Sequence, residues 1–192
     1  AGLTAACFSA GPAHVLDSQP SPARKLLATG GGRCNLTHDT DAEGIMAAFG
    51  RQSRFMSPAL QAFPPDEIRG FFRSRGVETL AEADGCVFPV SQKASDVAQA
   101  LVRAARANGA EIHCGERATR LVTEPAPCGG ATCERRIVAV ETTRGILPAS
   151  RVILAAGGQS YPGLGSDGSG FALARDAGLA ITPPVPALAG LV

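Results

Sequence analysis

A glycine and an aspartate near the start of the chain have the spacing of a dinucleotide-binding fingerprint. In the pattern Gly-x-Gly-x-x-Gly, the third glycine lets a helix pack closely on a strand, and an acid about 20 residues after the first glycine binds a ribose hydroxyl. Gly2 precedes a helix-forming segment, and Asp17 ends an apolar run 15 residues later. Taking Gly2 as the third glycine predicts Asp17 as the ribose ligand. A helix-starting glycine followed by a strand-ending acid is also common where no ligand binds.

A run of three glycines is the second candidate. Residues 30–32 are all glycine, and Lys25, Arg33, Cys34 and Asn35 flank them. Such a run permits positive φ angles and can present backbone N–H groups as an anion-binding nest, to which the two cations would add charge near a pyrophosphate. A flexible surface loop is the alternative. Cys34 beside Arg33 is a candidate reactive thiol, but a buried structural cysteine is the more common case.

Two further glycine-rich segments lie near the C-terminal end. An apolar run through Ala155 ends in Gly157 and Gly158, and small residues at a strand end let a ligand approach the backbone. Residues 163–172 form a glycine-rich turn that enters a helix, where anions are favoured. Ordinary turns are equally compatible with both segments.

The order of these motifs resembles the BaiN/RdsA (YhiN-like) family of NAD(P)/FAD-dependent oxidoreductases. The matching strings are Gly-Leu-x-Ala-Ala at 2–6, Lys-Leu-Leu-x-x-Gly-Gly-Gly-Arg-Cys-Asn-Leu-Thr at 25–37, Val-Phe-Pro-x-Ser-x-x-Ala-x-x-Val at 87–97, Ala-x-Gly-Gly-x-Ser-Tyr-Pro at 155–162 and Pro-Ala-Leu at 186–188. The resemblance implies an α/β fold, namely a glutathione-reductase-like FAD/NAD(P)-binding domain with a parallel sheet, a crossover helix and a β-meander. It also implies FAD and NAD(P)H as cofactors and reduction of a small-molecule substrate.

The resemblance also implies which residues contact the cofactor. These are Gly2, Asp17, Lys25, Gly31, Gly32, Arg33, Cys34, Asn35, Ala118 (by backbone contact with the adenine), Ala155, Gly157 and Gly158. The chain departs from the family pattern at three places. Asp17 stands where Glu is usual, Ala156 replaces Thr, and the acid of the turn at 165–170 has moved to Asp167. No residue is identified as a catalytic acid or base.

The helices and strands that must position these residues are predicted from the periodicity of apolar residues and from the glycines and prolines that end such segments. We expect helices starting at residue 2, over 41–75 with breaks at Pro58 and Pro64, from Ser95 to Gly109, and over 170–177, with Asp66 capping the second half of the 41–75 region. We expect strands at 13–17, 77–80, 85–89, 111–114, 117–123, 136–142 and 146–154, and the segment 152–156 running into Gly157. Strands 15–17, 111–114 and 152–155 should neighbour one another in one sheet.

Composition excludes several classes of protein. The 192 residues carry a formal net charge of +1, which argues against a nucleic-acid partner. The chain contains no run of 18 apolar residues, so the sequence does not predict a membrane-spanning helix. The six cysteines and three histidines lack the close spacing of a zinc site, so we expect no metal, and reduced thiols fit a cytoplasmic protein.

The sequence therefore predicts a FAD-dependent NAD(P)H oxidoreductase. We expect residues 1–182 to form a FAD-binding domain that is incomplete at its N-terminus, and 183–192 to form a linker. Because the chain starts without Met and without the first two fingerprint glycines, we expect a fragment, and we expect the 192 residues alone to be poorly soluble or colourless. The alternatives are a non-catalytic nucleotide-binding remnant and a flavin-dependent RNA-modifying enzyme of related fold.

Overall fold

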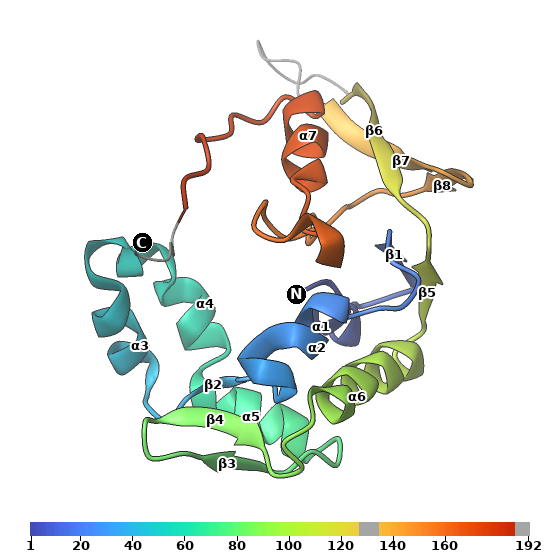
Figure 1. Cartoon of the computed structure of the whole chain (residues 1–192). Helices are drawn as coiled ribbons and strands as arrows, with labels where there is room; N and C mark the ends of the chain where they lie inside the picture. Colours follow the sequence, from blue (N-terminus) through green and yellow to red (C-terminus); the bar gives the residue numbers. More distant parts are fainter. Residues whose placement is uncertain (127–134, 187–192) are drawn as a thin grey trace. The chain divides into compact units, whose positions relative to one another are not determined.

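The computed structural model describes residues 1–126 and 135–186, and the chain forms two compact units (Figure 1). The first unit contains Ala1–Pro22 and Ala105–Val192, and the second contains Ala23–Ala104. The linker predicted at 183–192 extends outside the described residues. The extent of the FAD-binding domain, 1–182, stays a prediction.

A parallel strand pair lies at the centre of the first unit. β1 (Ala13–Asp17) pairs with β5 (Ala110–Cys114) in a register that runs from Ala13 opposite Ala110 to Asp17 opposite Cys114. Parallel neighbours need a long crossover, which here ends with α6 (Ala94–Ala107). α6 stops before Gly109, whose φ of +83° fits the left-handed position after a helix C-terminus. The predicted parallel αβ arrangement of these two strands is confirmed.

Helix α1 (Gly2–Cys7) packs on one face of this pair. Its Ala6 is buried with Ala105 and Ala110, and partly buried apolar residues of α1 and β1 surround them. The side-chain amide of Asn108 donates to the carbonyl oxygens of Ala6 and Ser9, each at 2.9 Å. Small side chains at this contact let the helix lie close to the strands.

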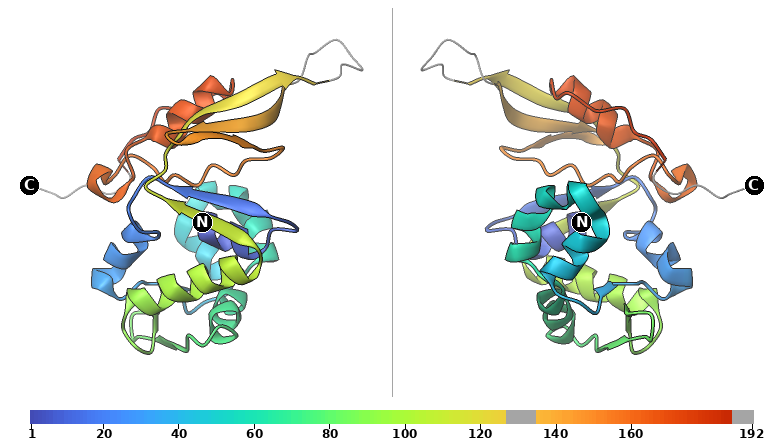
Figure 2. Two further views of the ribbon diagram at one scale, coloured as in Figure 1. Left: turned by 90° about the vertical axis from the view of Figure 1, so that its right-hand side faces the viewer. Right: turned by 90° about the vertical axis from the view of Figure 1, so that its left-hand side faces the viewer.

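An antiparallel meander completes the first unit. β6 (Ala118–Pro125), β7 (Arg135–Thr142) and β8 (Gly145–Pro148) pair in sequence order, as predicted. Figure 2 shows α7 (Ser169–Asp176) lying along this sheet. Leu121, Val140 and Leu173 are buried between them. The short η3 helix (Pro162–Leu164) precedes α7.

The second unit is mostly helical with a small antiparallel sheet in the order β2-β4-β3. Its elements are α2 (Arg24–Ala28), η1 (Thr29–Gly32), β2 (Thr37–His38), α3 (Ala42–Phe49), η2 (Gly50–Phe55), α4 (Ser57–Ala62), α5 (Pro65–Arg73), β3 (Thr79–Ala81), β4 (Cys86–Pro89) and most of α6. Phe71, Phe72, Val87 and Phe88 are buried in it.

The prediction of a strand at 152–155 beside β1 and β5 is wrong for the described chain. The meander ladder ends at Pro148, and residues 151–158 are assigned to no strand. A strand requires a neighbour for its N–H and C=O groups. Within residues 1–126 and 135–186, β1 pairs with β5 alone, and no strand is paired with 152–155. The apolar run is also not buried in the described chain, because Ile153 and Leu154 are exposed.

Two helix predictions also need correction. Pro58 does not break the 41–75 region, because it occupies the first turn of α4, where a missing N–H costs nothing; the break is η2. Asp66 is not an N-cap, since α5 already begins at Pro65 and Asp66 lies in its first turn. There its charge still favours the positive end of the helix.

Over the described residues, every helix is too short or too polar to cross a membrane. Among the described residues, Cys34, Cys86 and Cys114 form no disulfide. The cytoplasmic location stays a prediction.

Candidate functional site

The predicted cofactor-binding residues are divided between the two units. The first unit holds Gly2, Asp17, Ala118, Ala155, Gly157 and Gly158, and the second holds Lys25, Gly31, Gly32, Arg33, Cys34 and Asn35. Each unit thus contains six of these residues.

Gly2 lies at a close approach between helix and chain. A Cβ atom built on Gly2 would lie 3.4 Å from the Cβ of Ala155, which follows the extended segment after the meander. Two small residues therefore set the distance between the start of α1 and residues 152–156. The fingerprint expects such a packing role of its third glycine, and the assignment of Gly2 to that position stays a prediction.

Asp17 is the last residue of β1. One of its carboxylate oxygens, Oδ1, accepts a hydrogen bond of 2.9 Å from the N–H of Gln19, and its backbone carbonyl accepts from Glu116 at 3.1 Å. By strand alternation, Asp17 lies on the same face as Ala13 and Val15, which pack against α1. The prediction that Asp17 ends a strand is confirmed, and its carboxylate lies on the α1 side of the sheet.

The segment after Ala155 turns sharply at two glycines. Gly157 has a φ of +79°, and a Cβ there would lie 2.9 Å from Oγ of Ser166, which is buried. The carbonyl of Gly158 accepts a hydrogen bond of 3.1 Å from the N–H of Gly168. Only glycine fits position 157, both for its backbone angle and for space.

The glycine-rich turn before α7 packs against both the 155–158 segment and the end of β1. A Cβ on Gly170 would lie 3.1 Å from the Cβ of Ala156, and one on Gly165 would lie 3.2 Å from Cγ of Gln19. Residues 17–19, 155–158 and 165–170 therefore meet at one edge of the first unit. Small residues predominate along this edge.

An ion pair joins the turn to the meander. Nη1 of Arg117 lies 2.8 Å from Oδ2 of Asp167, and Ala118 follows directly as the first residue of β6. Hydrogen bonds from the hydroxyl and the N–H of Ser169, together with Arg117, lower the pKa of Asp167 to about 2. Asp167 is ionised at neutral pH and holds the start of α7. The displaced acid of the turn thus has a structural role here.

The loop at 29–35 in the second unit is built of left-handed residues. Gly30, Gly31 and Gly32 have φ angles of +56°, +66° and +88°, and Cys34 has +65°. A Cβ on Gly30 would lie 3.0 Å from both the N atom of Asn35 and Cε1 of Phe88, whereas one on Gly31 would meet nothing within 4 Å. Gly30 therefore packs against Phe88 of β4, whereas Gly31 and Gly32 are exposed.

Arg33 is engaged inside the second unit. Nη1 of Arg33 lies 2.7 Å from Oε1 of Glu82 and 3.2 Å from Oε1 of Gln92. The centre of its guanidinium lies 3.9 Å above the ring of Phe88, a cation–π arrangement. This side chain holds the loop on β4, and in this conformation its charge is largely balanced by Glu82.

Cys34 is a buried thiol. It is 4% exposed, and burial raises its pKa, an effect that a hydrogen bond with Thr29 partly offsets. A raised pKa lowers the thiolate fraction, so the structure favours the structural cysteine over the reactive one. Asn35, beside it, is exposed, and Lys25 is partly exposed on α2.

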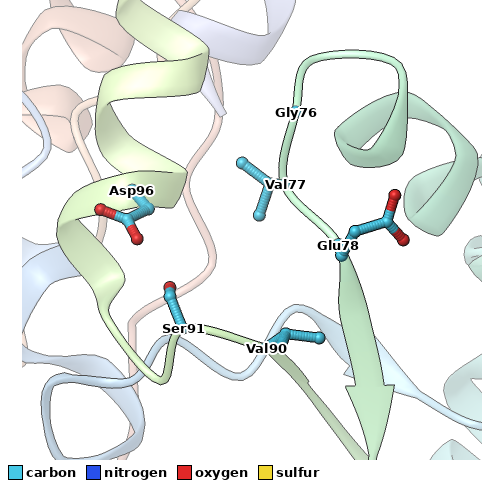
Figure 3. A pocket seen from close by; sticks show the side chains of 6 residues that line it. All are labelled: Gly76, Val77, Glu78, Val90, Ser91 and Asp96. Atoms are coloured by element: carbon cyan, nitrogen blue, oxygen red, sulfur yellow. The ribbon is translucent and has the colours of Figure 1, made fainter.

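A small hollow in the second unit contains none of these residues. Figure 3 shows the six residues that line it, Gly76, Val77, Glu78, Val90, Ser91 and Asp96. Its volume of about 220 Å³ is below the roughly 300–1,000 Å³ of typical ligand pockets. The carboxylate of Glu78 points away from the hollow and forms an ion pair with Arg73 at the end of α5. We do not assign the cofactor to it.

Sequence reasoning missed several side chains that build the first-unit edge. Ser166, Gln19 and Arg117 contact Gly157, Gly165 and Asp167 respectively. The glycine positions signal close neighbours, but they do not say which residues those are.

The chain belongs to the HI0933-like protein Rossmann domain family, whose sequence model matches residues 1–187. This places it among flavoprotein oxidoreductases with a mixed α/β, FAD/NAD(P)-binding fold, here seen as a parallel pair with antiparallel sheets. The resemblance drawn from the glycine motifs is confirmed.

Two curated relatives are similar over nearly the whole chain. The chain is 36% identical over 189 residues to the 3-dehydro-bile acid delta(4,6)-reductase of Clostridium scindens, covering 97% of this chain and 43% of that protein. It is 26% identical over 178 residues to the ribosomal RNA dihydrouridine synthase of Escherichia coli, covering 93% and 40%. The chain thus spans less than half the length of these relatives. Among solved structures, Thermovibrio ammonificans THI4 matches with a TM-score of 0.44 and 12% identity, covering 74% of this chain and 42% of that one.

Proposed function

We propose that this chain forms part of the FAD site of an NAD(P)H-dependent oxidoreductase that reduces a small molecule. The observation that supports this most is the edge of the first unit. There Gly2 and Ala155 permit a close approach, and Asp17 ends the neighbouring strand on the α1 side. The family to which the chain belongs is one of flavoproteins.

The residues present suit the adenosine half of FAD. Asp17 would accept hydrogen bonds from the ribose hydroxyls, because a carboxylate offers two oxygens and Gln19 uses one lone pair of one of them. Ala118 would meet the adenine through its backbone at the start of β6. The Gly157-Gly158 turn would keep side chains away from the dinucleotide.

For the loop of the second unit, taken by itself, the family motif supports a separate proposal of contact with the pyrophosphate and flavin. Gly31 and Gly32 carry exposed backbone at positive φ, and Lys25 lies on the helix that precedes them. Arg33, Cys34 and Asn35 would hold this loop in shape. Bound FAD would supply the hydride-transfer chemistry, with NAD(P)H as the electron source.

The substrate we propose is a small apolar molecule with a reducible carbon–carbon double bond. This extends to the chain what the name of the bile acid delta(4,6)-reductase says of that relative. The test is anaerobic mixing of the full-length flavin-loaded protein with NADH or NADPH, followed by a 3-dehydro-bile acid with 4,6 double bonds. Loss of the visible flavin bands, then their return with the bile acid, is expected. Flavin that stays oxidised with both nucleotides would favour a nucleotide-binding protein without this catalysis.

A second candidate is an RNA-modifying flavoenzyme, because the ribosomal RNA dihydrouridine synthase is also a relative, at 26% identity. The net charge of +1 gives this chain no general attraction to phosphates. Salt-dependent binding of the full-length protein to ribosomal RNA, with reoxidation of its reduced flavin by that RNA, would favour this candidate over the small-molecule one.

A further inference from the structure

His14 of β1 meets Glu111 and His113 of β5 on the parallel pair of the first unit. Nδ1 of His14 lies 3.0 Å from Nε2 of His113, and both nitrogens lie 3.6 Å from the same oxygen, Oε2 of Glu111. None of these residues belongs to the proposed FAD site. Their three donor atoms form a nearly regular triangle.

The strand register produces this cluster. His14 stands opposite Glu111, and Leu16 stands opposite His113, so alternation puts all four residues on one face of the pair. Ala13, Val15 and Asp17 lie on the other face, which carries α1. The cluster faces away from α1 and is open to solvent, with the side chains of His14, Glu111 and His113 exposed by 41%, 71% and 25%.

The triangle has the size of one face of a tetrahedral zinc site. Zinc binds His nitrogen at about 2.0–2.1 Å and carboxylate oxygen at about 2.0–2.2 Å, so tetrahedral ligand atoms lie about 3.3–3.5 Å apart. The observed separations of 3.0, 3.6 and 3.6 Å bracket that value. Two histidines and one carboxylate, with the fourth position left for water, are a ligand set that zinc uses.

A buried carboxylate lies behind His113. Oε2 of Glu116 lies 3.5 Å from Nδ1 of His113, and its side chain is only 5% exposed. Thr142 donates a hydrogen bond of 2.6 Å to the other oxygen, and Nη1 of Arg144 lies 3.9 Å from Oε2. A carboxylate at Nδ1 favours the tautomer that carries the proton there, which leaves the lone pair of Nε2 facing the cluster. Ligating histidines commonly have such a carboxylate on their second nitrogen.

We propose that His14, Glu111 and His113 bind one zinc ion and that Glu116 is a positioning residue for His113. The ion would join β1 to β5 across the strand pair, because one ligand comes from β1 and two come from β5. Binding to the folded protein alone would stabilise it by mass action. Without metal, the same 3.0 Å contact is a hydrogen bond between the two imidazoles.

The test uses Co²⁺ as an optical probe for the zinc position in the full-length protein, with any affinity tag removed. One Co²⁺ per chain is expected, with the visible d–d bands of a tetrahedral ion and no thiolate charge-transfer band. Zn²⁺ should displace it, whereas Mg²⁺, which prefers an octahedral oxygen shell, should not. A thiolate band would place the ion on cysteines and overturn the proposal.

Variants separate ligands from positioning residues. His14→Ala and Glu111→Gln should abolish stoichiometric Co²⁺ binding, and Glu116→Gln should weaken it about 10–100-fold. The matched control is His38→Ala, which removes an exposed strand histidine of the second unit and should change nothing. Since the Glu111 side chain is 71% exposed, Glu111→Gln does not threaten folding. Unchanged Co²⁺ binding in both Glu111→Gln and His14→Ala would overturn the zinc site, and the cluster would then be only a hydrogen-bonded pair of histidines.

Discussion

Asp17 has two separable roles at the scale of single residues. Its Oδ1 shapes the chain after β1 through the N–H of Gln19, and the carboxylate as a whole is the proposed ribose acceptor. Asparagine keeps an acceptor for Gln19 but loses the charge and one acceptor oxygen. Asp17→Asn therefore tests FAD binding while keeping the hydrogen bond to Gln19 that shapes the turn after β1.

We predict that Asp17→Asn weakens FAD binding to the full-length protein by about 1–3 kcal/mol, because a charge-assisted hydrogen bond is lost. Thermal unfolding without FAD should change little. Asp176→Asn, an equal change of charge at the exposed end of α7, is the control. Flavin fluorescence titration measures the affinity, and equal affinities for the two variants would remove Asp17 from the site.

Substitution of the two adjacent glycines should affect stability differently: alanine at 157 should lower the free energy of unfolding, and alanine at 158 should leave it nearly unchanged. Gly157→Ala should destabilise the fold by about 1–3 kcal/mol, because its φ of +79° disfavours a side chain and the new Cβ would lie 2.9 Å from Oγ of Ser166. Gly158→Ala meets nothing within 4 Å and has no positive φ. Urea unfolding of both variants measures the difference, and similar midpoints would contradict this account of the turn.

At the scale of elements, the Arg117–Asp167 pair connects the start of α7 to β6. The pKa of Asp167 is about 2, below its ordinary value of 3.8, chiefly through hydrogen bonds from Ser169 and then through Arg117. A depressed carboxyl pKa contributes stability that is present above pH about 4 and is lost as the pH falls toward 2. The side chains are 40% and 29% exposed, so solvent reduces this contribution to about 1 kcal/mol.

We therefore predict that Asp167→Asn lowers the free energy of unfolding by about 1 kcal/mol at pH 7 and by almost nothing at pH 2. The comparison is made by denaturant unfolding of the wild-type protein and the variant at pH 7, 4 and 2. A destabilisation that persists undiminished at pH 2 would mean that the ionised carboxylate is not what holds α7.

The elements also show which sequence signals determine structure. β1 has the predicted bounds because an apolar run between Pro12 and a polar loop has clear ends. The predicted strand at 146–154 stops at Pro148, because hydrogen-bonding partners depend on the rest of the sheet and not on local hydrophobicity. The pairing of Arg33 with Glu82 likewise joins residues 49 positions apart, which no local pattern reveals.

At the scale of the whole molecule, motif order predicted the family and its fold class, while the contacts within the site came only from the structure. The glycines at 30 and 157 lie against protein neighbours, Asn35 and Phe88 for Gly30 and Ser166 for Gly157, which the sequence does not reveal. The cluster of His14, Glu111 and His113 was not predicted, because its members look isolated until β1 and β5 are placed in register.

The central claim is that the edge around Gly2, Asp17 and Ala155 belongs to a dinucleotide site. The most direct measurement is the visible absorption spectrum of the purified full-length protein, followed by titration of the flavin-stripped protein with FAD and with riboflavin. We predict flavin bands at one FAD per chain and binding of FAD far tighter than that of riboflavin, because the adenosine half provides the contacts with Asp17 and Ala118. A colourless full-length protein that binds neither compound, or one that binds riboflavin as tightly as FAD, would contradict the claim.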